Sequence, residues 1–117
     1  MLKGGFNMTK GTGNEQTIYE ILREMIVEKG IKHCILLVTS EERDCFYANY
    51  LPEECIVFEV TEEGYSVFYT ERGQKVVEKK FEDLLDATWR LLYCISDSKE
   101  NYYELRNEFL KKAMPVL

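Results

Sequence analysis

The segment 55–80, with the sequence CIVFEVTEEGYSVFYTERGQKVVEKK, decides the fold of this 117-residue chain. Apolar residues alternate along it, and two short polar stretches, 61–64 and 71–74, interrupt the alternation. Alternation with a period of two is typical of strands that bury one face, and polar breaks that contain glycine are typical of hairpin turns. The segment therefore predicts three consecutive antiparallel strands.

The register of these strands follows from the requirement that their apolar residues share a face. One alignment achieves this, and it pairs Val60 with Tyr65, Phe58 with Val67 and Ile56 with Tyr69. Gly73 supplies the positive φ that the second turn needs, which places Val76 opposite Tyr69. The charges at 78–80 are of the kind that protects an exposed sheet edge. Tyr69 is expected to be partly buried in this register.

Helices are predicted on both sides of the meander. Apolar residues recur at helical spacing over 15–29, after Asn14 as a capping residue. They recur again in two helices over 81–95 and 97–113, the second with Asp97 as its capping residue. Residues 34–39 form a short apolar run that predicts a further strand. Segment 40–51 is open to two interpretations, a strand over 45–51 or a short helix capped by Ser40, and its aromatic residues favour the strand.

The predicted fold is α+β, with a central antiparallel sheet of about four to five strands packed against an N-terminal helix and two C-terminal helices. The glycine-rich residues 1–13 are expected to form a flexible tail, with Met8 as a second candidate start, and 14–117 a single α+β domain.

The charge balance disfavours several partners. Lysine and arginine total 15 against 21 for aspartate and glutamate, a net charge of −6. Proteins that bind nucleic acid normally carry the opposite sign in a stripe, so neither nucleic acid nor an anionic membrane is an expected partner. The sequence has no long apolar run and no secretory signal, which predicts a cytoplasmic location.

No catalytic or metal-binding pattern stands out, and neither a metal nor a cofactor is expected. The four cysteines are scattered and form no C-x-x-C pair. His33 and Cys34 are adjacent, but neighbours along a strand point to opposite faces and make a poor base–nucleophile pair. We therefore predict that the chain is not an enzyme.

One stretch resembles a known group of proteins. Residues 64–75, GYSVFYTERGQK, are followed by Phe81 and by Asp86-Ala87 in a helix. This combination resembles the small bacterial immunity proteins of polymorphic-toxin and contact-dependent growth inhibition systems, several of which share a Tyr-x-Glu-Arg-Gly turn. This chain has Tyr65 where a tryptophan often begins the strand.

The resemblance implies a cytoplasmic antidote that binds and neutralises one cognate toxin domain, commonly a nuclease with a basic cleft. An acidic surface suits such a partner. The residues predicted to bind the toxin are Glu62, Glu63, Tyr69, Glu71, Arg72, Glu82, Asp83 and Asp86. Two other functions stay open, a non-catalytic regulatory or adaptor domain and, as a third, a small cysteine-dependent enzyme. In the Glu-Arg-Gly turn, a structural role is expected ahead of direct toxin contact, with Gly73 serving the turn geometry and Glu71 and Arg72 tying the hairpin to a helix.

Overall fold

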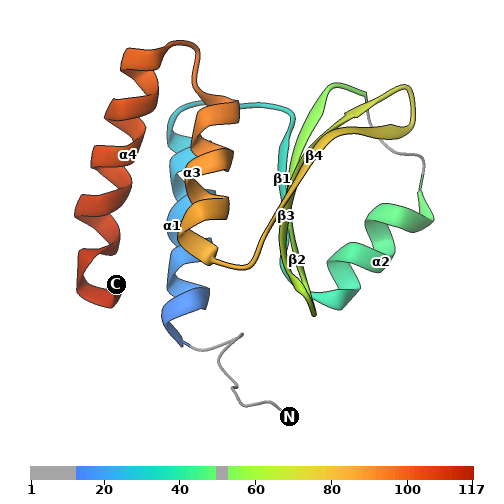
Figure 1. Cartoon of the computed structure of the whole chain (residues 1–117), viewed down its shortest axis with the longest axis horizontal. Helices are drawn as coiled ribbons and strands as arrows, with labels where there is room; N and C mark the ends of the chain where they lie inside the picture. Colours follow the sequence, from blue (N-terminus) through green and yellow to red (C-terminus); the bar gives the residue numbers. More distant parts are fainter. Residues whose placement is uncertain (1–12, 50–52) are drawn as a thin grey trace.

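The computed structural model describes residues 13–49 and 53–117, and it has the predicted α+β fold (Figure 1). The elements follow one another as α1 (Gly13–Glu28), β1 (Cys34–Leu37), α2 (Ser40–Ala48), β2 (Cys55–Thr61), β3 (Gly64–Glu71), β4 (Gln74–Phe81), α3 (Leu84–Ile95), α4 (Lys99–Ala113) and the 3₁₀ turn η1 (Met114–Val116). Helices α1 and α3 cover one face of the sheet with α4 outside them, and α2 lies on the other face. All but one residue of the predicted tail falls outside the described residues; Gly13 begins α1.

The sheet is mixed, not purely antiparallel as predicted. Its order is β1-β2-β3-β4, with β1 parallel to β2 and the other two pairs antiparallel. A parallel pair needs a crossover connection, because a tight turn cannot return the chain to the same end of the sheet. Helix α2 lies within this crossover, between β1 and β2.

The meander register is confirmed. The three predicted pairs between β2 and β3 are present, and Tyr69 pairs with Val76. Both Arg72 and Gly73 adopt positive φ, 52° and 76°. Positive φ at both central residues is the requirement of a two-residue type I′ hairpin.

Segment 40–48 is a helix, so the favoured strand over 45–51 is wrong within the described residues; 50–51 lie outside them. A capping box begins the helix: the hydroxyl of Thr39 accepts a hydrogen bond from the backbone of Glu42, and the Glu42 carboxylate accepts one from Thr39. Two backbone donors are satisfied in this way, which fixes the helix start. The cap is thus Thr39, not Ser40, and it outweighs the β propensity of the aromatic residues that follow.

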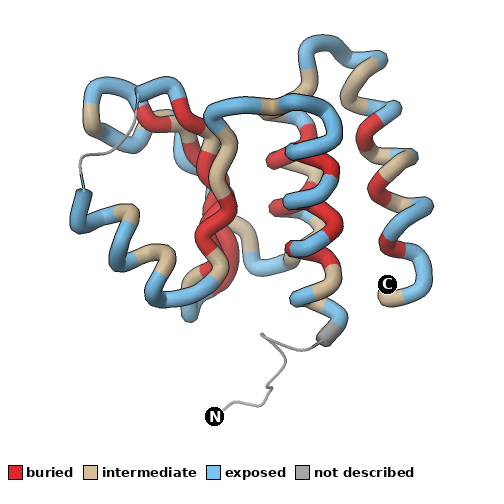
Figure 2. Tube along the Cα trace, turned by 180° about the vertical axis from the view of Figure 1, so that it is seen from behind, coloured by how far each residue is buried: buried red, intermediate tan, exposed pale blue. Residues whose placement is uncertain are grey.

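Buried side chains form two groups on opposite faces of the sheet. Buried positions follow the strands of the sheet and recur along the helices (Figure 2). On the helix face, Phe58 and Val67 pack with Leu91, Leu92 and Phe109. On the α2 face, a smaller group consists of Leu37, Cys55, Val57 and Phe68, with Ile35 and Phe46 partly buried against it. Helix α2 itself has no buried residue, so it covers this face only in part.

Three predicted helix boundaries shift. Helix α1 begins at Gly13, which places Asn14 inside it, and Phe81 is the last residue of β4. Helix α4 is capped by Ser98, whose hydroxyl accepts from the backbone of Asn101, where Asp97 was expected. Serine and aspartate are equally good caps, so adjacent candidates cannot be ranked from sequence.

Candidate functional site

The predicted toxin-binding residues divide between the two ends of the sheet. The β2–β3 turn and the β4–α3 connection both lie at the lower end in Figure 1, and the β3–β4 hairpin lies at the upper end. The lower group, which we call the acidic end, consists of Glu62, Glu63, Glu82, Asp83 and Asp86. The upper group consists of Tyr69, Glu71 and Arg72.

The acidic end is held together by a close backbone approach. Gly64 has φ +146°, and a Cβ placed on it would lie 2.4 Å from the carbonyl oxygen of Phe81. Only glycine allows this approach, so the turn that carries Glu63 packs directly against the loop that carries Glu82. The two segments, about twenty residues apart in sequence, therefore lie against each other and bring their acidic residues to the same end of the sheet.

Four of the five acidic side chains of this end are exposed and form no ion pair with another described residue. They are Glu63, Glu82, Asp83 and Asp86. Asp83 has a structural role as well, because its carboxylate accepts a hydrogen bond from the backbone of Asp86 and caps α3. The acidic end is therefore a region of negative potential available to a positively charged partner.

At the opposite end, the hairpin residues are also exposed. Within the described residues, Glu71 and Arg72 form no ion pair, so the proposed tie between this motif and a helix is absent. Tyr69 is half-buried, as expected. Burial and the neighbouring Cys94 thiol raise the pKa of Tyr69 to about 12.

Tyr69 lies between two hollows. One, of about 620 Å³, is lined by tyrosines of three elements, Tyr69, Tyr93, Tyr102 and Tyr103, and we call it the tyrosine hollow. Tyr93 and Tyr103 keep 57% and 49% of their surface exposed. The other, of about 700 Å³, lies under the hairpin and includes Glu71 and Arg72. Exposed tyrosines of this kind are common in protein interfaces.

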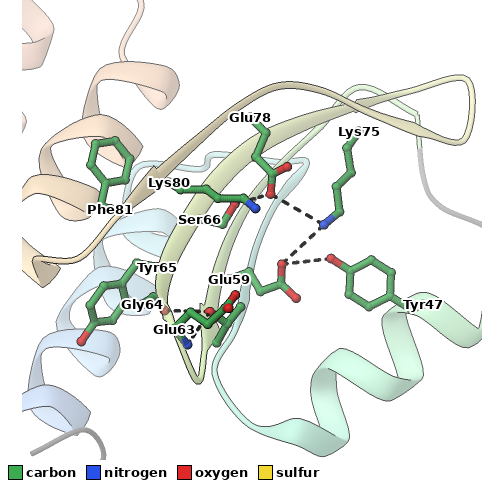
Figure 3. A pocket seen from close by; sticks show the side chains of 11 residues that line it. Tyr47, Glu59, Glu63, Gly64, Tyr65, Ser66, Lys75, Glu78, Lys80 and Phe81 are labelled. Atoms are coloured by element: carbon green, nitrogen blue, oxygen red, sulfur yellow. Dashed lines mark hydrogen bonds and ion pairs between the residues drawn. The ribbon is translucent and has the colours of Figure 1, made fainter.

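A third cavity, of about 320 Å³, lies on the α2 face and contains a buried carboxylate that the sequence interpretation missed (Figure 3). The side chain of Glu59 is only 7% exposed. Its Oε1 atom accepts a hydrogen bond of 3.0 Å from the Tyr47 hydroxyl and lies 3.8 Å from Lys75 Nζ. Lys75 Nζ also lies 3.7 Å from Glu78, whose Oε2 accepts a 2.6 Å hydrogen bond from Ser66. We call this the Glu59 cavity.

A β-bulge brings the charged residues of β4 to this face. The register shifts between Val67 and Tyr69, so that two residues of β4, Val77 and Glu78, stand opposite Phe68. Val77 has φ 52°, which is unusual for a β-branched residue. Residues three apart on a regular strand point to opposite faces, but the extra residue places Glu78 on the same face as Lys75.

Lys75 is the cation that lies between the Glu59 and Glu78 carboxylates of this cavity. Burial opposes its charge, but the hydrogen bond with Tyr47 and the nearby Glu59 and Glu78 together raise its pKa above the ordinary value. Its Nζ lies 4.6 Å from the centre of the Phe68 ring and 5.1 Å from that of Tyr47. Carboxylates and aromatic rings together are the groups that recognise a cationic head.

The His33–Cys34 pair has no catalytic geometry. His33 is exposed and has φ 62°, and Cys34 lies under the helices. Burial raises the pKa of Cys34 to about 12, so this thiol is protonated at neutral pH. Across residues 13–49 and 53–117, no group of three or more histidine, cysteine, aspartate or glutamate side chains could hold a metal ion.

Comparisons with protein-family models, with curated proteins and with solved structures found no match for this chain. In the part of the chain that the structure describes, no helix is both long enough and apolar enough to cross a bilayer. The sequence did hold one signal for the Glu59 cavity, since Glu59 is a charged residue inside the apolar strand β2.

Proposed function

We propose that this protein binds and neutralises a cognate bacterial toxin domain in the cytoplasm, as an immunity protein does. The observation that supports the proposal best is the convergence of two separate acidic segments, the β2–β3 turn and the β4–α3 loop, into one exposed end. A basic toxin domain, such as a nuclease with a cleft for nucleic acid, is the complementary partner. Complementary charge accelerates capture and suppresses binding to wrong partners.

The second line of support is that Glu63 and Glu82 form no ion pair with any described residue. Carboxylates with a role in the fold can pair with lysine or arginine or lie at helix starts. Asp83 and Asp86 fit the helix-start role, but Glu63 and Glu82 do not. An exposed pair without such a role is available for a partner.

The protein acts by binding rather than by catalysis in this proposal. The cysteine beside the only histidine is partly buried, and its raised pKa keeps it protonated, which disfavours the thiolate that a cysteine nucleophile requires. Nucleic acid and membranes are not proposed partners, because both would be repelled by the net charge of −6.

The proposal predicts that a gene beside this one encodes the toxin domain, and co-expression with that domain tests it. The wild-type protein should restore growth to cells that express this toxin domain, and the two should co-purify. A second culture that expresses an unrelated toxin domain is the control, and the protein should not restore growth there. A protein that neither binds nor rescues would overturn the proposal and leave the adaptor alternative.

A further inference from the structure

The Glu59 cavity has acceptor capacity that the chain does not use. Glu59 Oε1 accepts a hydrogen bond from Tyr47 and forms an ion pair with Lys75. Oε2 makes no hydrogen bond or ion pair to any described residue (Figure 3). The side chain is more than nine-tenths buried and lines the cavity. Oε2 keeps some access to solvent, so it is free to accept a hydrogen bond from water or from a ligand in the cavity.

The cavity lining is also short of one positive charge. Its acidic side chains are Glu59, Glu63 and Glu78, and its basic side chains are Lys75 and Lys80, which leaves one net negative charge. A single further cation would neutralise the lining. The walls already accept a cation, because Lys75 Nζ is held over the Phe68 and Tyr47 rings between two carboxylates.

We propose that the Glu59 cavity receives one arginine side chain of a partner protein, with the guanidinium group bound to Glu59 Oε2. A guanidinium has five donors in a planar fork and suits a site where several acceptors surround one opening. Its weaker hydration makes it easier to bury than an ammonium group. A cavity of about 320 Å³ is large enough for this head group without movement of the backbone.

This inference rests on the proposed function for the identity of the partner, because Glu63 belongs to both the acidic end and the cavity lining. The acidic end would attract the basic surface of the toxin domain, and the cavity would fix one of its arginines. A buried arginine anchor beside a charged rim is a common arrangement in tight interfaces.

A titration without any toxin tests the cavity directly. Nα-acetyl-arginine methylamide is added to isotopically labelled wild-type protein and followed by NMR. Nα-acetyl-citrulline methylamide, which has the same shape without the charge, is the matched ligand control. The arginine compound should give saturable shifts at the amides of Tyr47, Ser66 and Glu78, and the citrulline compound should not.

Two variants locate the binding. Glu59→Gln should weaken the affinity for the arginine compound at least about tenfold. Glu20→Gln, at an exposed position on α1, should leave this affinity unchanged. Glu63→Gln, at an exposed position, should weaken the affinity for the arginine compound by a smaller factor. This variant replaces Glu59→Gln as the test if Glu59→Gln does not fold. Absence of saturable shifts, equal response to citrulline, or unchanged affinity in the folded variants would overturn the inference. If the protein rescues growth but does not bind the arginine compound, the inference about the cavity is wrong and the proposed function stands. If it binds the arginine compound but does not rescue growth, the proposed function is wrong and the inference about the cavity stands.

Discussion

Gly64→Ala should force apart the two segments of the acidic end, because the alanine Cβ would lie 2.4 Å from the carbonyl oxygen of Phe81. Real Cβ contacts are not closer than 3.0 Å, so the two backbones must separate by about 0.6 Å. Forcing such a shift in a packed region costs about 1–3 kcal/mol. The φ of +146° adds about 1–3 kcal/mol for a residue with a Cβ. The free energy of unfolding should therefore fall by about 2–6 kcal/mol.

Gly73→Ala is the matched control for this substitution. Gly73 has φ +76°, but a Cβ there would meet no atom within 4 Å, so only the backbone cost of about 1–2 kcal/mol remains. Urea denaturation followed by circular dichroism measures both losses. At an m value of about 1.5 kcal/mol per molar, a loss of 3 kcal/mol lowers the midpoint by roughly 2 M. Equal losses in the two variants, or a Gly64→Ala midpoint close to wild type, would refute the reasoning.

Two further predictions concern titration and thiol chemistry. The pKa of Tyr69 is about 12 in the folded state, against about 10 when unfolded, so its stabilising effect is complete below pH 10 and is lost as the pH rises toward 12. In Tyr69→Phe, the free energy of unfolding measured with urea should fall less steeply between pH 9 and about 11.5 than in the wild type. The exposed Tyr103→Phe should keep the wild-type slope, and a wild-type slope in Tyr69→Phe would contradict the prediction. Iodoacetamide should label the exposed Cys45 in the native protein and reach Cys34, whose pKa is about 12, only after unfolding; peptide mass spectrometry that finds native Cys34 labelled as fast as Cys45 would be the contrary result.

The meander could be predicted from sequence because local rules determine it. Alternation fixed the faces of β2 and β3, and the apolar pairing of Val60 with Tyr65 fixed the register. The parallel pairing of β1 with β2 was not predictable in the same way. It depends on α2, and the capping box that starts α2 competes with the β propensity of Phe46 and Tyr47.

The candidate site was only partly predictable for a geometric reason. Glu62 and Glu63 join Glu82 because a glycine contact brings two turns together, and no spacing in the sequence reveals that contact. The Glu59 cavity depends on a bulge at Val77, which turns Glu78 toward Lys75. A bulge changes which residues share a face, and its position cannot be read from alternation alone.

The central claim is that the acidic end recognises a basic toxin domain, and the affinity of one charge-neutralised variant tests it most directly. The variant combines Glu63→Gln, Glu82→Gln and Asp83→Asn, in which asparagine preserves the cap of α3. The control removes the same number of charges elsewhere, with Glu20→Gln, Glu24→Gln and Asp44→Asn, all at exposed positions.

Isothermal calorimetry with the toxin domain of the neighbouring gene, at low and at high salt, gives the comparison. The acidic-end variant should bind at least about tenfold more weakly than wild type at low salt, equivalent to about 1.4 kcal/mol, and the gap should narrow at high salt. The control variant should retain nearly the wild-type affinity. Wild-type affinity in the acidic-end variant, or an equal loss in the control, would contradict the claim.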